Sequence, residues 1–171
     1  MLYTSAKACP LSKCKKYATL CHMTSNSQPT IYLASDHGGF ALKTRLAEFL
    51  TTKLGYKVED LGPASYNKTD DYPDFAHKLT TEVLKTKQLG ILICTSGIGM
   101  CLSANKIKGI RAGIGFNLAV AKSMKNDNNT NVLCLPAKHL TEDHALAIAK
   151  TWLATPFSGD ERHVRRLGKI E

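Results

Sequence analysis

A cysteine and two hydroxyl side chains stand where an apolar run meets a glycine-rich turn, in the sequence ILICTSGIG of residues 91–99. The apolar run predicts a buried strand, and the glycines predict a tight turn that opens a helix. At such a position the backbone amides and the helix dipole favour a thiolate at Cys94, which makes this residue a candidate base or nucleophile. The alternative is that Cys94 is a small buried hydrophobic residue that continues the strand.

The turn itself carries Ser96, Gly97, Ile98 and Gly99. Its amides are suited to a developing oxyanion or a phosphate, but the same residues also suit a plain strand-to-helix turn. The sequence lacks the full G-x-G-x-x-G pattern and the P-loop lysine, which argues against a nucleotide-binding loop.

Asp36 and His37 follow another apolar run and precede the paired glycines Gly38 and Gly39. A carboxylate and an imidazole at the mouth of a strand are suited to binding a sugar hydroxyl or an anion, and the glycines favour close approach of a ligand. The alternative is a helix N-cap followed by a surface histidine.

Near the C-terminus, Arg162, His163 and Arg166 lie at helical spacing. Three cationic groups on one helix face fit a phosphate clamp. A solvated basic tail has the same composition, so this interpretation stays open at the level of pattern.

The elements that must position these residues alternate between β-rich runs and helical periods. This pattern predicts an α/β three-layer sandwich, in which a five-stranded parallel Rossmann-like sheet has helices on both faces. We expect a ligand crevice outside the carboxyl ends of the strands, where the residues that follow each strand converge. The predicted strands are 31–35, 56–60, 90–94, 109–113 and 131–135, and the predicted helices are 40–55, 73–87, 97–107, 117–125, 141–153 and part of 159–171.

Composition limits the class of protein. The chain has 171 residues, of which 43% are hydrophobic and 22% charged, which suits one globular domain. It has no apolar run long enough for a membrane span and no secretory signal pattern, so we expect a cytoplasmic protein. The net charge is +9, but aromatic residues are only 7% and do not alternate with arginine, which argues against nucleic acid as a partner.

Residues 1–30 differ from the rest because they carry four lysines and no acidic residue. We interpret them as a disordered or targeting-like leader, or as an over-called start ahead of Met23, followed by one domain over residues 31–171. The leader contains Cys9, Cys14, Cys21 and His22, but these lack the paired C-x-x-C spacing of a zinc site. We predict no metal site, and we expect the six cysteines to be reduced thiols.

Taken together, the motifs resemble the ribose-5-phosphate isomerase type B family. The agreement runs in order from about residue 31 to 167, and the leader lies outside it. It rests on the segments 35–40, 71–73, 90–94 with 97–99, 104–106, 109–112, 129–133 and 162–163.

This resemblance implies an aldose–ketose isomerase that interconverts ribose 5-phosphate and ribulose 5-phosphate without a metal or organic cofactor. It implies a homodimer, or a dimer of dimers, whose active sites are shared between subunits. Cys94 would be the base that moves a proton between C1 and C2, and Ser96 would assist at the carbonyl oxygen. The amides of residues 97–99 would stabilise the enediolate, which is the charge that such a reaction must accommodate.

The resemblance also implies the residues that bind substrate. Asp36 and Tyr72 would bind the sugar. The phosphate would be held by His37, Arg162, His163 and Arg166, with the C-terminal groups donated by the neighbouring subunit.

Two positions depart from the family pattern. The family usually has a ring-opening histidine where this chain has Asp127, which precedes the substrate-binding candidate Asn128. A carboxylate can still accept the hydroxyl proton. Lys138 stands where the family often has a phosphate-binding arginine, so the charge is kept but the bidentate fork is lost.

Two alternative functions follow from these departures. One is an isomerase of a six-carbon aldose 6-phosphate, which a changed ring-opening residue would permit. The other, from a different class, is a non-catalytic sugar-phosphate-binding protein, against which the presence of Cys94 and Ser96 argues.

Overall fold

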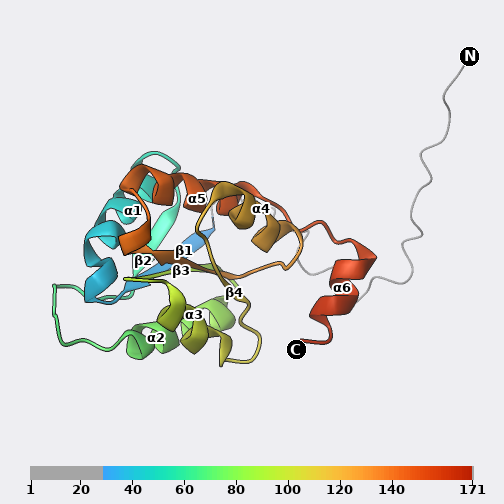
Figure 1. Ribbon diagram of the computed structural model, residues 1–171, viewed down its shortest axis with the longest axis horizontal. Coiled ribbons are helices and arrows are strands. Elements are labelled where there is room, and N and C mark those ends of the chain that lie inside the picture. Colours follow the sequence, from blue (N-terminus) through green and yellow to red (C-terminus); the bar gives the residue numbers. More distant parts are fainter. Residues whose placement is uncertain (1–28, 171) are drawn as a thin grey trace, which may run out of the picture.

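The computed structural model describes residues 29–170, and these form an α/β fold in three layers (Figure 1). The middle layer is a parallel sheet of five strands in the order β2-β1-β3-β5-β4, which confirms the predicted fold class. The elements in chain order are β1 (Thr30–Ser35), η2 (His37–Gly39), α1 (Phe40–Thr52), β2 (Lys57–Asp60), α2 (Tyr72–Thr86), β3 (Leu89–Cys94), α3 (Ile98–Asn105), β4 (Ala112–Ile114), α4 (Leu118–Asn126), β5 (Val132–Pro136), η3 (Ala137–His139), α5 (Glu142–Ala154) and α6 (Glu161–Leu167).

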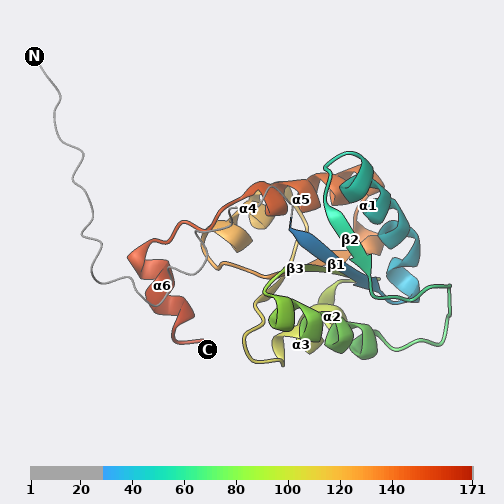
Figure 2. The same ribbon diagram turned by 180° about the vertical axis from the view of Figure 1, so that it is seen from behind.

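Helices cover both faces of the sheet. Helices α1, α4 and α5 lie on one face, and α2 and α3 lie on the other (Figures 1 and 2). Successive strand residues point to opposite faces, so Ile31 and Leu33 join the first core while Tyr32 and Ala34 join the second. The strands β1, β3 and β5 are therefore buried on both sides, which explains their continuous apolar runs, whereas the edge strand β2 is largely exposed.

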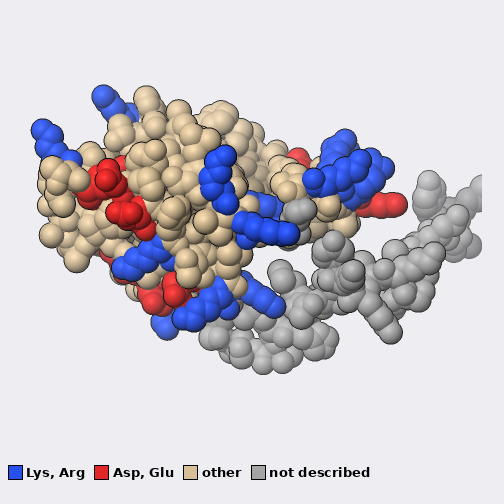
Figure 3. Space-filling model, turned by 90° about the horizontal axis from the view of Figure 1, so that it is seen from below, with Lys and Arg blue, Asp and Glu red and all other residues tan. Residues whose placement is uncertain are grey.

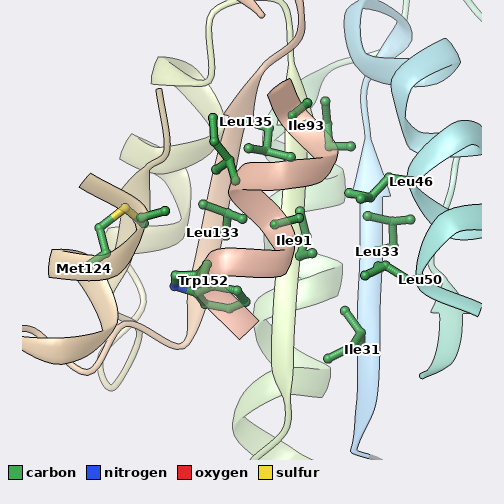
Figure 4. Close-up of a cluster of buried hydrophobic side chains, with 14 residues drawn as sticks. Ile31, Leu33, Leu46, Leu50, Ile91, Ile93, Met124, Leu133, Leu135 and Trp152 are labelled. Atoms are coloured by element: carbon green, nitrogen blue, oxygen red, sulfur yellow. The ribbon is translucent and has the colours of Figure 1, made fainter. Parts of the chain in front are cut away.

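The larger core includes Trp152 of α5, Met124 of α4 and Leu133 of β5 (Figure 4). The indole ring is fully buried, and its Nε1 donates a hydrogen bond to Oγ1 of Thr130 at 2.8 Å. The polar end of this large side chain is thus satisfied while its ring contributes to the core.

The connections that follow the neighbouring strands β1 and β3 lead to opposite faces of the sheet. The segment after β1 leads to α1 on one face, whereas the segment after β3 leads to α3 on the other. A crevice forms where two such connections diverge, at the carboxyl ends of the strands. The amide of Asp36 joins the two strand ends by donating to the carbonyl of Ile93 at 3.3 Å.

The fourth strand differs from the prediction of 109–113, since β4 spans Ala112–Ile114. Gly109 has a left-handed φ of 87°, and the amide of Ile110 donates to the carbonyl of Ile107 in a turn. Because glycine favours this conformation, the apolar run begins as a turn and pairs with β5 only from Ala112. Helix α3 correspondingly ends at Asn105, two residues before the predicted end.

The leader and the candidate ligands Cys9, Cys14, Cys21 and His22 lie outside the described residues, apart from Pro29 and Thr30. Thr30 already pairs with Lys57 as the first residue of β1. Within residues 29–170, no helix combines the length and the apolar character that crossing a membrane requires. The predicted C-terminal helix is confirmed as α6.

Candidate active site

Cys94 ends β3 and faces the glycine turn that opens α3. Its Sγ accepts a hydrogen bond from the amide of Gly97 at 3.1 Å, and its side chain is only 4% exposed. Gly97 has a φ of 74°, which other residues rarely adopt, so the sharp return of the chain over the sulfur depends on glycine. The thiol therefore meets the N-terminus of a helix in a water-poor setting.

Several backbone amides are available at this turn. The amide of Ile98 donates to Oγ of Ser96 at 3.3 Å, and the first amide to donate back into the turn is that of Cys101, to Gly97, at 3.1 Å. The amides of Gly99 and Met100 lie between these two and have no backbone acceptor among residues 29–170. Two free donors therefore remain beside Cys94 and Ser96 for a negatively charged oxygen.

Asp36 is held at the end of β1 by the short helix that follows it. Its Oδ1 accepts a hydrogen bond from the amide of Gly39 at 3.0 Å. Burial raises the pKa of the Asp36 carboxyl, and the hydrogen bond from Gly39 opposes this rise only in part. The alternative interpretation of Asp36 as an N-cap is thus confirmed, and its role in binding a ligand stays a prediction.

Gly38 and Gly39 are required by packing, a reason that the sequence did not indicate. A Cβ on Gly38 would collide with the Thr95 side chain, and one on Gly39 would lie 2.5 Å from the carbonyl oxygen of Ile93. The glycines therefore allow the end of β3 to approach closely, and close approach of a ligand to them stays a prediction. This packing is what brings Asp36 and His37 beside the Cys94 turn.

Tyr72 enters the site from the start of α2. A Cβ on Gly99 would lie 2.8 Å from two atoms of its ring, so the ring packs directly on the first turn of α3. The phenol side chain is 41% exposed. The ring is thus placed beside the free amides with its surface open to a ligand.

Lys138 reaches the same edge of the sheet after β5. Its amide donates to the carbonyl of Thr95 at 3.0 Å, and its side chain is exposed. Lys138, Gly38 and Thr95 help to line a cavity of about 460 Å³, and Cys94 is not among the lining residues. The cavity therefore lies beside the cysteine turn rather than over the sulfur.

A second group of predicted site residues lies at the opposite end of the sheet. Asp127 and Asn128 precede β5, so they stand at the amino ends of the strands. Helix α6 carries Arg162, His163 and Arg166, and both ribbon views place it beyond that end, away from η2 (Figures 1 and 2).

His163 joins these two segments. It is buried, and its Nε2 lies 3.6 Å from Oδ1 of Asp127 and 3.9 Å from Oδ2 of Asp160. Basic side chains gather over α6 on the face seen in Figure 3. A single chain therefore assembles the predicted site as two separate halves.

Asp70 was missed as a site residue, because in sequence it reads only as part of a polar loop before a helix. In the structure its carboxylate contacts both the backbone and the ring of His37. Asp71, the next residue, is the N-cap of α2 and makes no side-chain capping bond. No local pattern distinguishes the two carboxylates, and only tertiary contact assigns Asp70 to the site. Among residues 29–170, no group of three or more potential ligands is arranged to hold a metal ion.

The fold and the site define a Rossmann-like α/β protein with a thiol, a hydroxyl and free amides at the carboxyl edge of its sheet. Residues 31–170 match the family described as Ribose/Galactose Isomerase. The chain belongs to this family, and it is an isomerase.

Similar proteins agree with this membership. A Mycoplasma genitalium protein named "Probable ribose-5-phosphate isomerase B" is 42% identical over 142 residues, which are 82% of this chain and 92% of that protein. The crystal structure of a ribose 5-phosphate isomerase from Thermotoga maritima is 40% identical, with a TM-score of 0.79 over 83% of this chain and 97% of that chain. The Mycoplasma genitalium ribose-5-phosphate isomerase B with bound ribulose-5-phosphate is 41% identical, with a TM-score of 0.79 over 82% of this chain and 93% of that chain.

Proposed function

We propose that this isomerase interconverts ribose 5-phosphate and ribulose 5-phosphate through an enediolate, with Cys94 as the base. The observation that carries the proposal is the position of Sγ, which accepts the Gly97 amide at the start of α3 beside two free amides. The relative with bound ribulose-5-phosphate supports the choice of a five-carbon substrate.

In this mechanism the Cys94 thiolate removes the proton from the carbon that carries the hydroxyl group and returns it to the carbonyl carbon. A second proton moves from the hydroxyl oxygen to the carbonyl oxygen, so that the two carbons exchange their oxidation states. The negative charge passes to the carbonyl oxygen, which Ser96 and the free amides of Gly99 and Met100 stabilise. The amides of Gly97 and Ile98 already donate to Sγ of Cys94 and to Oγ of Ser96, so they orient these two groups. Loss of one such donor typically costs roughly 3–4 kcal/mol of transition-state stabilisation. The buried setting of Cys94 strengthens these interactions because little water competes for them.

The carboxyl edge of the sheet also carries groups for the rest of the substrate. Asp36 and Tyr72 bind sugar hydroxyls, and His37 and Lys138 bind the phosphate. Their support is their common position around the crevice, where η2, α2 and η3 meet the end of β3.

The other half of the site comes from a second copy of the chain in a homodimer. Cys94 stands at the carboxyl end of β3, whereas the amino end of the sheet and helix α6 beyond it carry Asp127, Asn128, Arg162, His163 and Arg166 (Figure 2). We infer that the partner's copies of these residues complete the site. Apolar side chains next to the Cys94 turn support such an interface, since they are 44–61% exposed in the single chain. They are Ile98, Leu102, Phe116 and Leu118.

Because Asp127 stands where the family usually has a ring-opening histidine, isomerisation of a six-carbon aldose 6-phosphate is a second candidate function. Oδ1 of Asp127 lies 3.6 Å from Nε2 of His163. The group that accepts the proton during ring opening is therefore a carboxylate with an imidazole beside it. Turnover of ribose 5-phosphate and of allose and galactose 6-phosphates by the same preparation separates the two candidates. Preference for a six-carbon sugar would contradict the proposed substrate.

Cys94→Ala tests the catalytic role. We expect turnover to be lost while binding of ribose 5-phosphate, measured by calorimetry, persists. Unchanged turnover would refute the role of the thiol. Binding by wild type without any turnover would instead favour the sugar-phosphate-binding protein.

Mixing variants tests the shared site. Cys94→Ala and Arg166→Ala homodimers should each be nearly inactive, because each lacks one half of both sites. Random exchange of their subunits should restore about a quarter of wild-type activity, since half of the dimers are hybrids and each hybrid has one intact site. No recovery after verified subunit exchange would contradict the shared site.

A further inference from the structure

The loop between β2 and α2 brings Asp70 against His37, a residue 33 positions earlier in the chain. Oδ1 of Asp70 accepts a hydrogen bond from the backbone amide of His37 at 3.0 Å and lies 2.6 Å from Nδ1 of its ring. The Asp70 side chain is only 8% exposed, whereas that of His37 is 34% exposed. One buried oxygen therefore holds both the backbone and the imidazole of a residue at the mouth of the site.

This contact determines which ring nitrogen of His37 carries a proton. A carboxylate oxygen can only accept, so a contact of 2.6 Å requires a proton on Nδ1. Nε2 makes no hydrogen bond with any residue of the described chain. It is therefore the ring atom left for a ligand.

The loop that carries Asp70 is anchored to the sheet and to α1. Lys43 is fully buried, and its Nζ donates to the side chain of Asp60 and to the carbonyl of Pro63, the latter at 2.9 Å. The amide of Asp70 itself donates to the carbonyl of Asn67 at 3.2 Å. These contacts fix the start of the loop and the turn that leads into Asp70, and a group that orients another must itself be held.

The second oxygen of the Asp70 carboxylate indicates that the contact has more than a structural purpose. Oδ2 is buried and has no hydrogen-bond partner among residues 29–170. Burying an unsatisfied carboxylate oxygen costs stability, and a neutral acceptor would hold the loop at a smaller cost. The negative charge is therefore best explained by its effect on the imidazole.

We propose that Asp70 is a positioning residue, which fixes Nδ1–H of His37 and aims Nε2 at the substrate phosphate. The proposal rests on the proposed function, in which His37 binds that phosphate. Nε2 can donate to a phosphate only when it is protonated as well, so in the complex the imidazolium lies between two anions. Asp70 thus supplies the charge on the far side of the ring.

The experiment compares Asp70→Ala with wild type, with Glu59→Gln as a control that removes an exposed carboxylate of β2. Nitrogen-15 NMR of the His37 ring should show a protonated Nδ1 in wild type and in the control, and its loss in Asp70→Ala. The KM for ribose 5-phosphate should rise roughly tenfold in Asp70→Ala, the range for a hydrogen bond to a charged group, with kcat within about twofold. Inhibition by inorganic phosphate should weaken by the same factor, and Asp70→Ala should add nothing in a His37→Ala background.

An unprotonated Nδ1 in wild type would overturn the proposal, as would an equal effect of Asp70→Ala with and without His37. If Asp70→Ala does not fold, Asp70→Asn keeps the acceptor and removes the charge, and it should still weaken phosphate binding. Undiminished phosphate binding in Asp70→Asn would then refute the role of the charge. If wild type does not isomerise ribose 5-phosphate, the proposed function fails, whereas the NMR signal and a phosphate titration still decide the role of Asp70.

Discussion

Gly99→Ala tests whether the position of the Tyr72 ring matters for catalysis. The added Cβ would lie 2.8 Å from Cε2 and Cζ of Tyr72 and 3.1 Å from Cε1. Ordinary contact begins near 3.4 Å, so the ring must retreat by roughly 0.6 Å. A misplacement of about 1 Å in a site can cost about 100-fold in rate, so we expect kcat/KM to fall by about 10- to 100-fold.

Stability should not account for this loss. Gly99 lies inside α3, where alanine is favoured over glycine by about 0.5–1 kcal/mol, and this gain offsets the cost of moving a ring that is partly exposed. We therefore expect the free energy of unfolding to change by less than about 1 kcal/mol. The amides of the turn also remain, because the substitution leaves the backbone N–H in place.

The assay is steady-state turnover of ribose 5-phosphate, together with thermal unfolding of each variant. Gly168→Ala is a matched control, because a Cβ there would meet only ordinary contacts beyond 3.6 Å at a φ of −65°. Tyr72→Leu provides a second background in which the collision with the phenol ring is absent. There, Gly99→Ala should have little further effect on kcat/KM.

Two results would refute the reasoning. If Gly99→Ala leaves kcat/KM unchanged, the place of the Tyr72 ring does not matter for turnover. If it lowers kcat/KM equally in the Tyr72→Leu background, the loss arises in the turn itself and not through the ring.

Three further predictions concern single side chains. Burial raises the pKa of Asp36, so its negative charge destabilises the folded state as pH rises. Asp36→Asn should therefore unfold at a higher temperature than wild type at pH 7. This difference in unfolding temperature should disappear below pH 3.8, where the carboxyl group of wild type is protonated as well. Burial lowers the pKa of Lys125 to about 8, so the free energy of unfolding of wild type rises with pH from about 8 to 10.5. The difference in unfolding free energy between Lys125→Met and wild type should therefore shift in favour of wild type over this pH range, and denaturant unfolding that shows no such shift would contradict the prediction. Asp127→Asn should slow turnover of the cyclic sugar more than that of an open-chain analogue, and equal effects would exclude Asp127 from ring opening.

Much of the fold could be predicted from the sequence because its signals are local. The apolar run before Cys94 and the glycine turn at Gly97 each depend on neighbours within a few residues, and the structure has them as a strand and a turn. The predicted start of β4 was wrong, and the reason is local as well. Gly109 adopts a left-handed φ, and apolar character alone does not distinguish such a turn from a strand.

The residues of the candidate site also differ in whether the sequence could predict that they lie together. Residues that follow parallel strands must meet at one edge of the sheet, so Asp36, Cys94 and Lys138 could be grouped from sequence. The contact between Asp70 and His37 could not, because its partners are 33 positions apart and no periodic pattern relates them.

The sequence alone thus determined which residues form strands and helices, and which side chains stand at strand ends, since hydrophobic period and turn chemistry are properties of short segments. Only the tertiary structure decided that Gly38 and Gly39 serve packing against β3, that Asp70 holds His37, and that α6 lies at the opposite end of the sheet from Cys94. These outcomes depend on which distant surfaces pack together, and that choice is made by the burial of the whole core rather than by any one segment.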